Sequence, residues 1–191
     1  MKRFHPQLEI WLTVENWSGP NGTGRLLSKK RIKCHSYLGN LINVLYAEFA
    51  YVAASAYDTA GTLQSWGPSF DEKATAGAGA DAYGIQVGTG TAANDVARYA
   101  LAAKISHGTG AGQLQYGAVS ITSPTTIGQK RQFTIARVFT NNSGASITVN
   151  EVGLVLLCSI YNILVERTLS TNTILNGASA TWTYTISITT S

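Results

Sequence analysis

The chain has 191 residues, of which 45% are hydrophobic and 13% are charged, and its formal net charge is +4. The length fits one domain, and the hydrophobic content is sufficient for a core, which excludes a globally disordered chain. The charged share is about half that of an average soluble protein, so we expect a surface that neighbouring molecules largely cover.

The positive charge is concentrated in the first 34 residues, where seven Lys and Arg residues stand against Glu9 and Glu15. Four of them form a cluster that could contact nucleic acid or an acidic partner: Lys29, Lys30, Arg31 and Lys33. The alternative is a solvated run of charges that leads into a helix. No aromatic residues alternate with the cluster, so base stacking has no support.

No membrane partner is expected, because the longest apolar stretch, residues 41–56, is too short for a bilayer and contains Asn43 and Glu48. The apolar stretch at residues 8–14 is short and interrupted by Glu9, which makes a poor signal peptide. We therefore expect a soluble protein without an export signal.

The first predicted element is a strand over residues 8–14, in which apolar residues occupy every second position. A turn cluster at residues 18–22 ends it. After the basic run, Ser36 is a plausible N-cap, and apolar residues then recur at steps of three and four: Leu38, Leu41, Ile42, Leu45, Phe49 and Val52. This pattern predicts one amphipathic helix over about residues 36–54, which would pack on the β-domain or on a neighbouring copy.

Residues 55–82 have no periodicity and are rich in Gly, Ala, Thr and Ser, which is typical of a functional loop or an interaction arm. A short strand is predicted at residues 83–87. Residues 98–105 fit either a helical turn or an irregular crossing segment, and residues 107–112 form a second glycine-rich loop.

Five more strands are predicted towards the C-terminus: residues 114–122, 129–141, 146–158, 162–169 and 180–190. The closing strand places Trp182, Tyr184, Ile186 and Ile188 on one face and Thr or Ser on the other. Asn141-Asn142-Ser143-Gly144 predicts a hairpin turn between two of these strands.

Short strands at this spacing predict a mainly β protein, an antiparallel β-sandwich of jelly-roll-like type. One N-terminal amphipathic helix and long Gly/Ala/Thr-rich loops complete the expected fold. The expected organisation is an N-terminal strand, basic run and helix (1–54), a loop or insertion arm (55–82) and a β-sandwich domain (83–191).

No pattern in the chain is typical of a catalytic, metal or cofactor site. Gly88-Thr89-Gly90 follows a strand but lacks the third glycine and the βαβ unit of a dinucleotide loop. Glu151 lies in mid-strand, where it could be half of an acid pair. The favoured interpretation is an ion pair across strands or between subunits, with Arg137 or Arg167.

Four aromatic residues, which we expect to be exposed, are candidates for stacking on sugar rings: Trp17, Trp66, Tyr116 and Trp182. Trp182 lies on the apolar face of an alternating strand, so core packing explains it more simply. A polysaccharide hydrolase would need two acids about 5 to 10 Å apart, and this acid-poor chain offers few.

Five segments, in this order, resemble a family of small virion proteins encoded in the structural modules of tailed bacteriophages: residues 83–90 (YGIQVGTG), 99–108 (YALAAKISHG), 112–117 (GQLQYG), 137–144 (RVFTNNSG) and 147–154 (ITVNEVGL). The basic run and helix at residues 28–52 are also similar to that family's N-terminal portion. The resemblance covers about residues 26–188, and the segment 55–82 matches only as a variable insertion.

The resemblance implies a non-enzymatic structural protein of the virion, made in the host cytoplasm and without a cofactor. It would form a symmetric homo-oligomer with other virion proteins in the neck, tail, fibre attachment or capsid decoration. The basic cluster could then meet packaged DNA or an acidic protein rim. The alternative is a carbohydrate- or receptor-binding module on a phage fibre or capsid surface.

Overall fold

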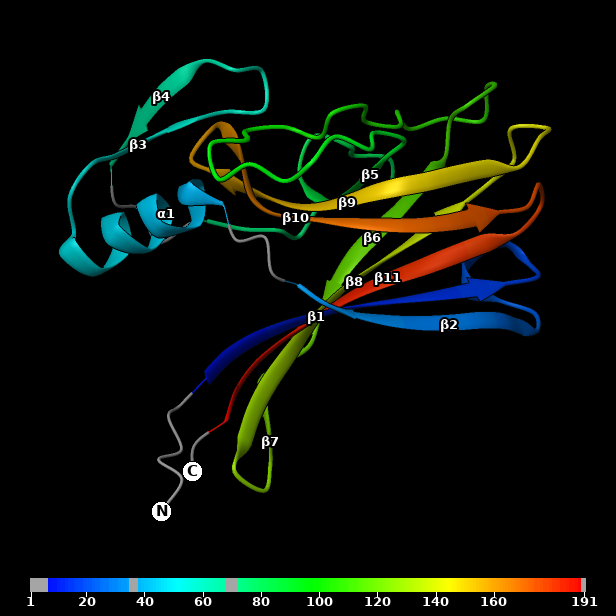
Figure 1. The fold of residues 1–191 in the computed structure, drawn as a ribbon, viewed down its shortest axis with the longest axis horizontal. Coiled ribbons are helices and arrows are strands. Elements are labelled where there is room, and N and C mark those ends of the chain that lie inside the picture. Colours follow the sequence, from blue (N-terminus) through cyan, green and yellow to red (C-terminus); the bar gives the residue numbers. More distant parts are fainter. Residues whose placement is uncertain (1–6, 35–37, 68–71, 190–191) are drawn as a thin grey trace.

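The structure is a computed structural model that describes residues 7–34, 38–67 and 72–189. Its fold is mainly β with antiparallel sheets, as the sequence predicts. The larger sheet has six strands in the order β2 (Leu26–Lys33), β1 (Gln7–Trp17), β11 (Ser179–Thr189), β8 (Lys130–Thr140) and β6 (Gln115–Ile121), with β7 (Thr125–Ile127) paired to β8 (Figure 1). The smaller sheet has the order β10 (Tyr161–Ile174), β9 (Ile147–Cys158) and β5 (Gly84–Gly88).

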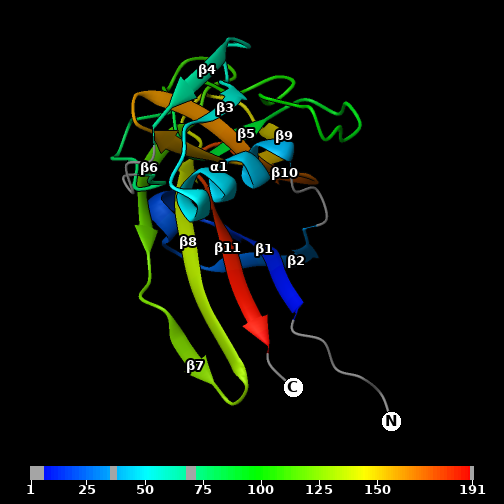
Figure 2. The same ribbon diagram turned by 90° about the vertical axis from the view of Figure 1, so that its left-hand side faces the viewer.

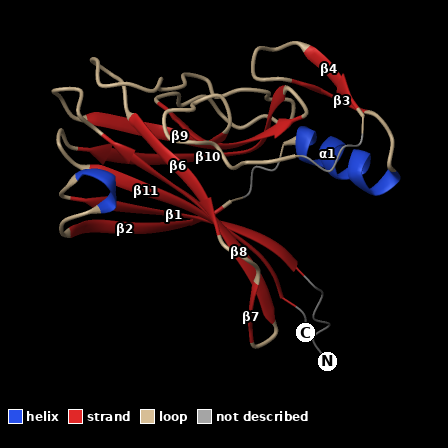
Figure 3. Ribbon diagram, turned by 180° about the vertical axis from the view of Figure 1, so that it is seen from behind, coloured by secondary structure: helices blue, strands red, loops and turns tan. Residues whose placement is uncertain are grey.

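Three smaller elements lie around the sheets: α1 (Gly39–Ala50), the hairpin of β3 (Ala54–Tyr57) and β4 (Leu63–Trp66), and the 3-10 turn η1 (Pro20–Gly22) between β1 and β2. Figure 3 shows α1 and η1 at opposite ends of the molecule. The two ends therefore present different elements to their surroundings.

The two sheets share one hydrophobic core, because alternate residues of each strand face the other sheet. Trp182 and Tyr184 of β11 are fully buried in it, as the alternation of the closing strand predicts. Ile188 of the same face is 44% exposed. The reason is visible in Figures 1 and 2, where β1, β8 and β11 extend beyond the smaller sheet.

The N-terminal strand and the basic run belong to the larger sheet. β1 pairs with β11 from Gln7↔Thr189 to Trp17↔Ser179, and the basic run is the edge strand β2. The expected boundary at residue 54 therefore does not separate an arm from the sheet. α1 is shorter than the helix expected at residues 36–54, and the predicted N-cap at Ser36 lies outside the described residues.

Two expected connections differ from the structure. Asn141-Asn142-Ser143-Gly144 does not close a hairpin, because β8 and β9 belong to different sheets and the turn carries the chain from one layer to the other. Residues 55–82, expected as one loop, contain the β3–β4 hairpin. Residues 98–105 adopt the irregular alternative and not the helical one.

A long segment between β4 and β6, residues 67–114, has β5 as its one strand among the described residues. Arg137 of β8, a residue that is only 1% exposed, holds the first half of this segment. Its five N–H groups all donate to backbone carbonyls: those of Gly117, Tyr83, Ile85, Gly77 and Ala80. The ring of Tyr116 lies 4.7 Å from the guanidinium carbon and covers it.

Glu151 of β9 holds the second half. Its buried carboxylate accepts hydrogen bonds from the backbone N–H groups of Gly90, Ala102 and Ala103, and pairs with Arg167 Nε at 2.6 Å. Desolvation alone would raise the pKa of Glu151, but the N–H groups of Ala103 and Ala102 and the Arg167 guanidinium together hold it below its usual value. Arg167 also donates to Asn94 Oδ1 at 2.7 Å and to the carbonyl of Ala92 at 3.0 Å.

This arrangement explains the glycines of Gly88-Thr89-Gly90. A side chain at Gly88 would place its Cβ 2.6 Å from Glu151 Oε1, and one at Gly90 would come closer still. Glycine is therefore needed so that the backbone can approach a buried carboxylate. No bound phosphate is required to account for the motif.

We expect Arg137→Met to lower the free energy of unfolding by about 3–5 kcal/mol, because buried carbonyls lose their donors at once. Urea denaturation of the purified variant measures this. Arg131→Met is the matched control, since Arg131 lies on the same strand but is exposed and donates to Thr126 Oγ1. A loss below about 1 kcal/mol in Arg137→Met would contradict the role assigned to this guanidinium.

Candidate assembly surface

Helix α1 is apolar on two sides. Val44 and Ala47 are buried, and Leu41 and Leu45 face the molecule as part of a groove described below. On the other side, Ile42, Tyr46 and Phe49 are 63%, 60% and 86% exposed, and we call these three residues the outer ridge. Neighbouring large apolar side chains that are this exposed often mark an interaction site, so the outer ridge is an unusual surface for an isolated chain.

Side-chain amides fix the orientation of α1. Asn40 Nδ2 donates to the carbonyl of Leu164 in β10 at 3.2 Å, and Asn43 Nδ2 donates to that of Ser55 in β3 at 3.0 Å. These bonds hold one side of the helix against the rest of the fold. The outer ridge is therefore held in an outward position.

An apolar groove of about 570 Å³ lies beside α1. Aliphatic and aromatic side chains from both sheets and the helix form most of its wall: Leu8, Ile10, Leu41, Leu45, Ile121, Phe133, Ile135, Leu154, Leu156, Val165 and Ile186. Figure 2 shows the reason, since α1 lies above the ends of β1, β8 and β11 that extend beyond the smaller sheet. The wall residue Leu8 is 56% exposed, so apolar surface continues out of the groove.

A buried carboxyl group lies at the wall of this groove. Glu166 of β10 is 1% exposed, and it accepts hydrogen bonds from Thr168 Oγ1 at 2.5 Å and from the hydroxyl of Tyr184. Burial raises the pKa of Glu166 from 4.5 to about 7, against the opposing effect of these two hydroxyls. The neighbouring thiol of Cys34 is buried as well, and burial also raises its pKa.

The four basic residues predicted as a contact lie on β2, at the edge of the larger sheet. Lys29 Nζ is 2.7 Å from Glu15 Oε1 and Lys33 Nζ is 2.6 Å from Glu9 Oε1, so two of the four charges have acidic partners on β1. Arg31 lies 4.3 Å from the ring centre of Trp11 on the same face, and Lys30 is exposed. Charged side chains on an edge strand also prevent unwanted pairing with other strands.

The sequence predicts an ion pair of Glu151 with Arg137 or Arg167, and the structure shows the pair with Arg167. Glu151 and Arg167 pair within one chain and both are fully buried, so this pair does not lie between subunits. Arg137 lies elsewhere and binds carbonyls. The sequence pattern marked these residues by their mid-strand positions, but the N–H groups that Glu151 also binds come from residues 90–103, which no pattern predicted.

Three of the four aromatic residues considered for sugar stacking are buried. Trp66 is 4%, Tyr116 2% and Trp182 0% exposed, and Trp17 is partly buried. Tyr116, Phe139 and Trp182 pack edge to face, with ring centres 4.6 and 5.2 Å apart. The interpretation of these residues as an exposed stacking surface is therefore wrong.

Within the described residues, no group of three or more His, Cys, Asp or Glu side chains could hold a metal ion. None of the helices in that part of the chain is long and apolar enough to cross a membrane.

Glu166 should make the stability of the protein fall as the pH rises. Between pH 4.5 and about 7 the folded state keeps the proton that the unfolded state loses, so stability decreases over this window by about 3 kcal/mol. Glu166→Gln should remove that decrease. Urea denaturation at a series of pH values compares the two proteins, and equal slopes for both would contradict the assignment.

Comparisons of the chain with protein-family models, curated proteins and solved structures found no match. The resemblance to virion proteins of tailed bacteriophages therefore rests on the quoted sequence segments alone.

Proposed function

We propose that this protein is a non-enzymatic structural component of a tailed-phage virion that assembles as a symmetric homo-oligomer. Its fold is proposed to be a jelly-roll-like β-sandwich with an N-terminal helix that serves as an assembly element. The observation that carries the proposal is the outer ridge of Ile42, Tyr46 and Phe49, which α1 presents to solvent. The low share of charged residues supports it, because unpaired charge at an interface is costly.

The partner that fits these surfaces is a second copy of the chain. Each copy carries both an apolar projection, the outer ridge, and an apolar concavity, the groove. Because ridge and groove are different surfaces, a contact between them is head-to-tail, and such contacts close into rings when the rotation allows. A ring is the arrangement expected for a neck or tail component.

A lipid surface fits the ridge less well. Helices that lie in a membrane interface carry Lys or Arg on their polar side, which contact anionic lipids. α1 has the sequence GNLINVLYAEFA, with Glu48 as its one charged residue. Protein is therefore the better partner for this helix.

Phe49→Asp should disrupt the oligomer, since it places a charge in an apolar contact, while the fold should survive because Phe49 is 86% exposed. Light scattering after size-exclusion chromatography gives the mass. Leu175→Asp is the matched control, an exposed apolar residue in the β10–β11 turn at the opposite end (Figure 1). A wild-type protein that stays monomeric at every concentration tested would contradict the proposal.

A mixing experiment tests the head-to-tail geometry. Phe49→Asp damages the ridge and Leu8→Asp damages the groove, so each variant alone should be monomeric. Mixed together, they should form a one-to-one dimer that grows no further, because one intact ridge meets one intact groove. Failure of the mixture to dimerise, although wild type assembles, would exclude this geometry.

The position on the particle is the remaining part of the proposal. A reconstruction of the intact virion would distinguish a ring on the tail axis from copies spread over the capsid. At a neck, β2 would offer Lys30 and Arg31 to packaged DNA or to an acidic rim. Charge reversal of Lys29, Lys30 and Lys33 that leaves assembly and DNA retention intact would exclude that contact.

A further inference from the structure

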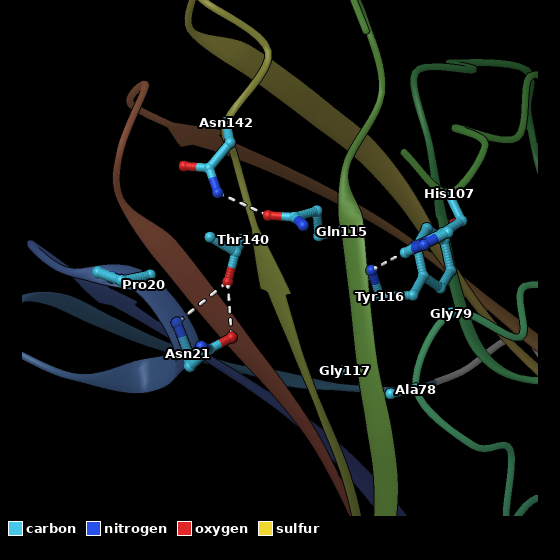
Figure 4. A pocket seen from close by; sticks show the side chains of 10 residues that line it. All are labelled: Pro20, Asn21, Ala78, Gly79, His107, Gln115, Tyr116, Gly117, Thr140 and Asn142. Atoms are coloured by element: carbon cyan, nitrogen blue, oxygen red, sulfur yellow. Dashed lines mark hydrogen bonds between the residues drawn. The ribbon is translucent and has the colours of Figure 1, made fainter. Parts of the chain in front are cut away.

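A second concave site lies at the end opposite α1, where η1, the loops at residues 78–79 and 107, the start of β6 and the end of β8 converge (Figures 3 and 4). Its volume of about 400 Å³ falls within the range of about 300–1,000 Å³ that is usual for small-molecule sites. None of its lining residues is Asp, Glu, Lys or Arg. The lining is therefore uncharged and combines polar with apolar groups.

The polar side chains of the pocket are only partly satisfied by one another. Asn142 Nδ2 donates to Gln115 Oε1 at 2.5 Å, and the backbone N–H of Tyr116 donates to His107 Nδ1 at 3.0 Å (Figure 4). Because Nδ1 accepts, the neutral imidazole carries its proton on Nε2. Among the hydrogen bonds of the described residues, none uses His107 Nε2 or Gln115 Nε2 as a donor, and none uses Asn142 Oδ1 as an acceptor. These two donors and one acceptor can therefore pair with a ligand.

The walls of the pocket are held in place before any ligand binds. Asn21 has a left-handed backbone (φ 53°), and its N–H donates to the buried Thr140 Oγ1 at 3.0 Å. On the other wall, the N–H of Gly79 donates to the carbonyl of Tyr116 at 2.9 Å. Gly79 also has a positive φ of 81°, and a Cβ there would lie 3.4 Å from His107 Nε2 and narrow the site. Such preorganisation lowers the entropy cost of binding.

We infer that this pocket binds a neutral saccharide unit. A sugar hydroxyl both donates and accepts, so vicinal hydroxyls can pair with the two donors and the acceptor together. An anion would leave the oxygen of Asn142 facing a negative charge with no cation in the lining. A peptide strand pairs best along an exposed sheet edge. Here the carbonyl of Tyr116 and the N–H of Val119 on the edge strand β6 are already paired with Gly79 and Ala76.

The inference goes beyond the proposed assembly and does not depend on it, since ridge and groove lie at the other end of the molecule. It also differs from the stacking surface considered from the sequence. Tyr116 contributes a buried ring whose hydroxyl donates to the carbonyl of Ile105, so the side chains of Gln115, Asn142 and His107 are the ones that would contact the ligand.

Saturation-transfer NMR on the full chain tests this with four probes: methyl α-D-glucoside, methyl α-D-mannoside, methyl β-D-galactoside and N-acetyl-D-glucosamine. At least one should receive saturation from the protein. Gln115→Ala and Asn142→Ala should each raise its dissociation constant about fivefold, the effect of one net hydrogen bond. Asn150→Ala is the matched control, because Asn150 is a partly exposed amide on β9 outside the pocket, and it should change nothing.

Two further probes separate the other ligand classes. N-acetylglycinamide, which offers peptide groups, should receive no saturation, and inorganic phosphate should not displace the saccharide. The inference is overturned if no saccharide receives saturation, if both pocket variants bind as tightly as Asn150→Ala, or if the amide probe binds in preference. Thermal denaturation of the variants verifies that each is folded.

Discussion

The long irregular segment between β4 and β6 must satisfy its backbone polar groups inside a compact fold, and buried charged side chains make this possible. Arg137 gives all five of its N–H groups to carbonyls, while Glu151 accepts from three backbone N–H groups. An unpaired buried backbone group costs free energy comparable to a lost hydrogen bond. Arg137 and Glu151 therefore supply the hydrogen bonds that a neighbouring strand would supply to a regular strand.

The two ends of the molecule present different surfaces. Because Arg137 fixes the carbonyls of Gly77 and Ala80, it holds the wall of the neutral pocket beside Gly79. At the other end, β1, β8 and β11 continue past the smaller sheet, which leaves apolar side chains without a covering layer. One end thus presents hydrogen-bonding groups and the other an apolar ridge and groove, so ligand binding and assembly would use separate surfaces.

Glu166 is buried in the molecule and also forms part of the wall of the groove. It lies among apolar side chains at the groove wall, and its carboxyl is held by hydroxyls from β10 and β11. Burial favours the protonated form, which is why the core is expected to be more stable below neutral pH. The position of this group could not be predicted from spacing, because Thr168 shares its strand but Tyr184 comes from the facing sheet.

The sequence by itself determined the antiparallel β character and the buried face of Trp182 and Tyr184, because side-chain alternation is a local property of a strand. It did not reveal β2, since Lys and Arg are poor strand signals and an edge strand tolerates them. Only the tertiary structure decided which strands pair, that residues 141–144 join two layers, and which distant N–H groups Glu151 binds. Those features depend on contacts between residues far apart in the chain, which no local pattern contains.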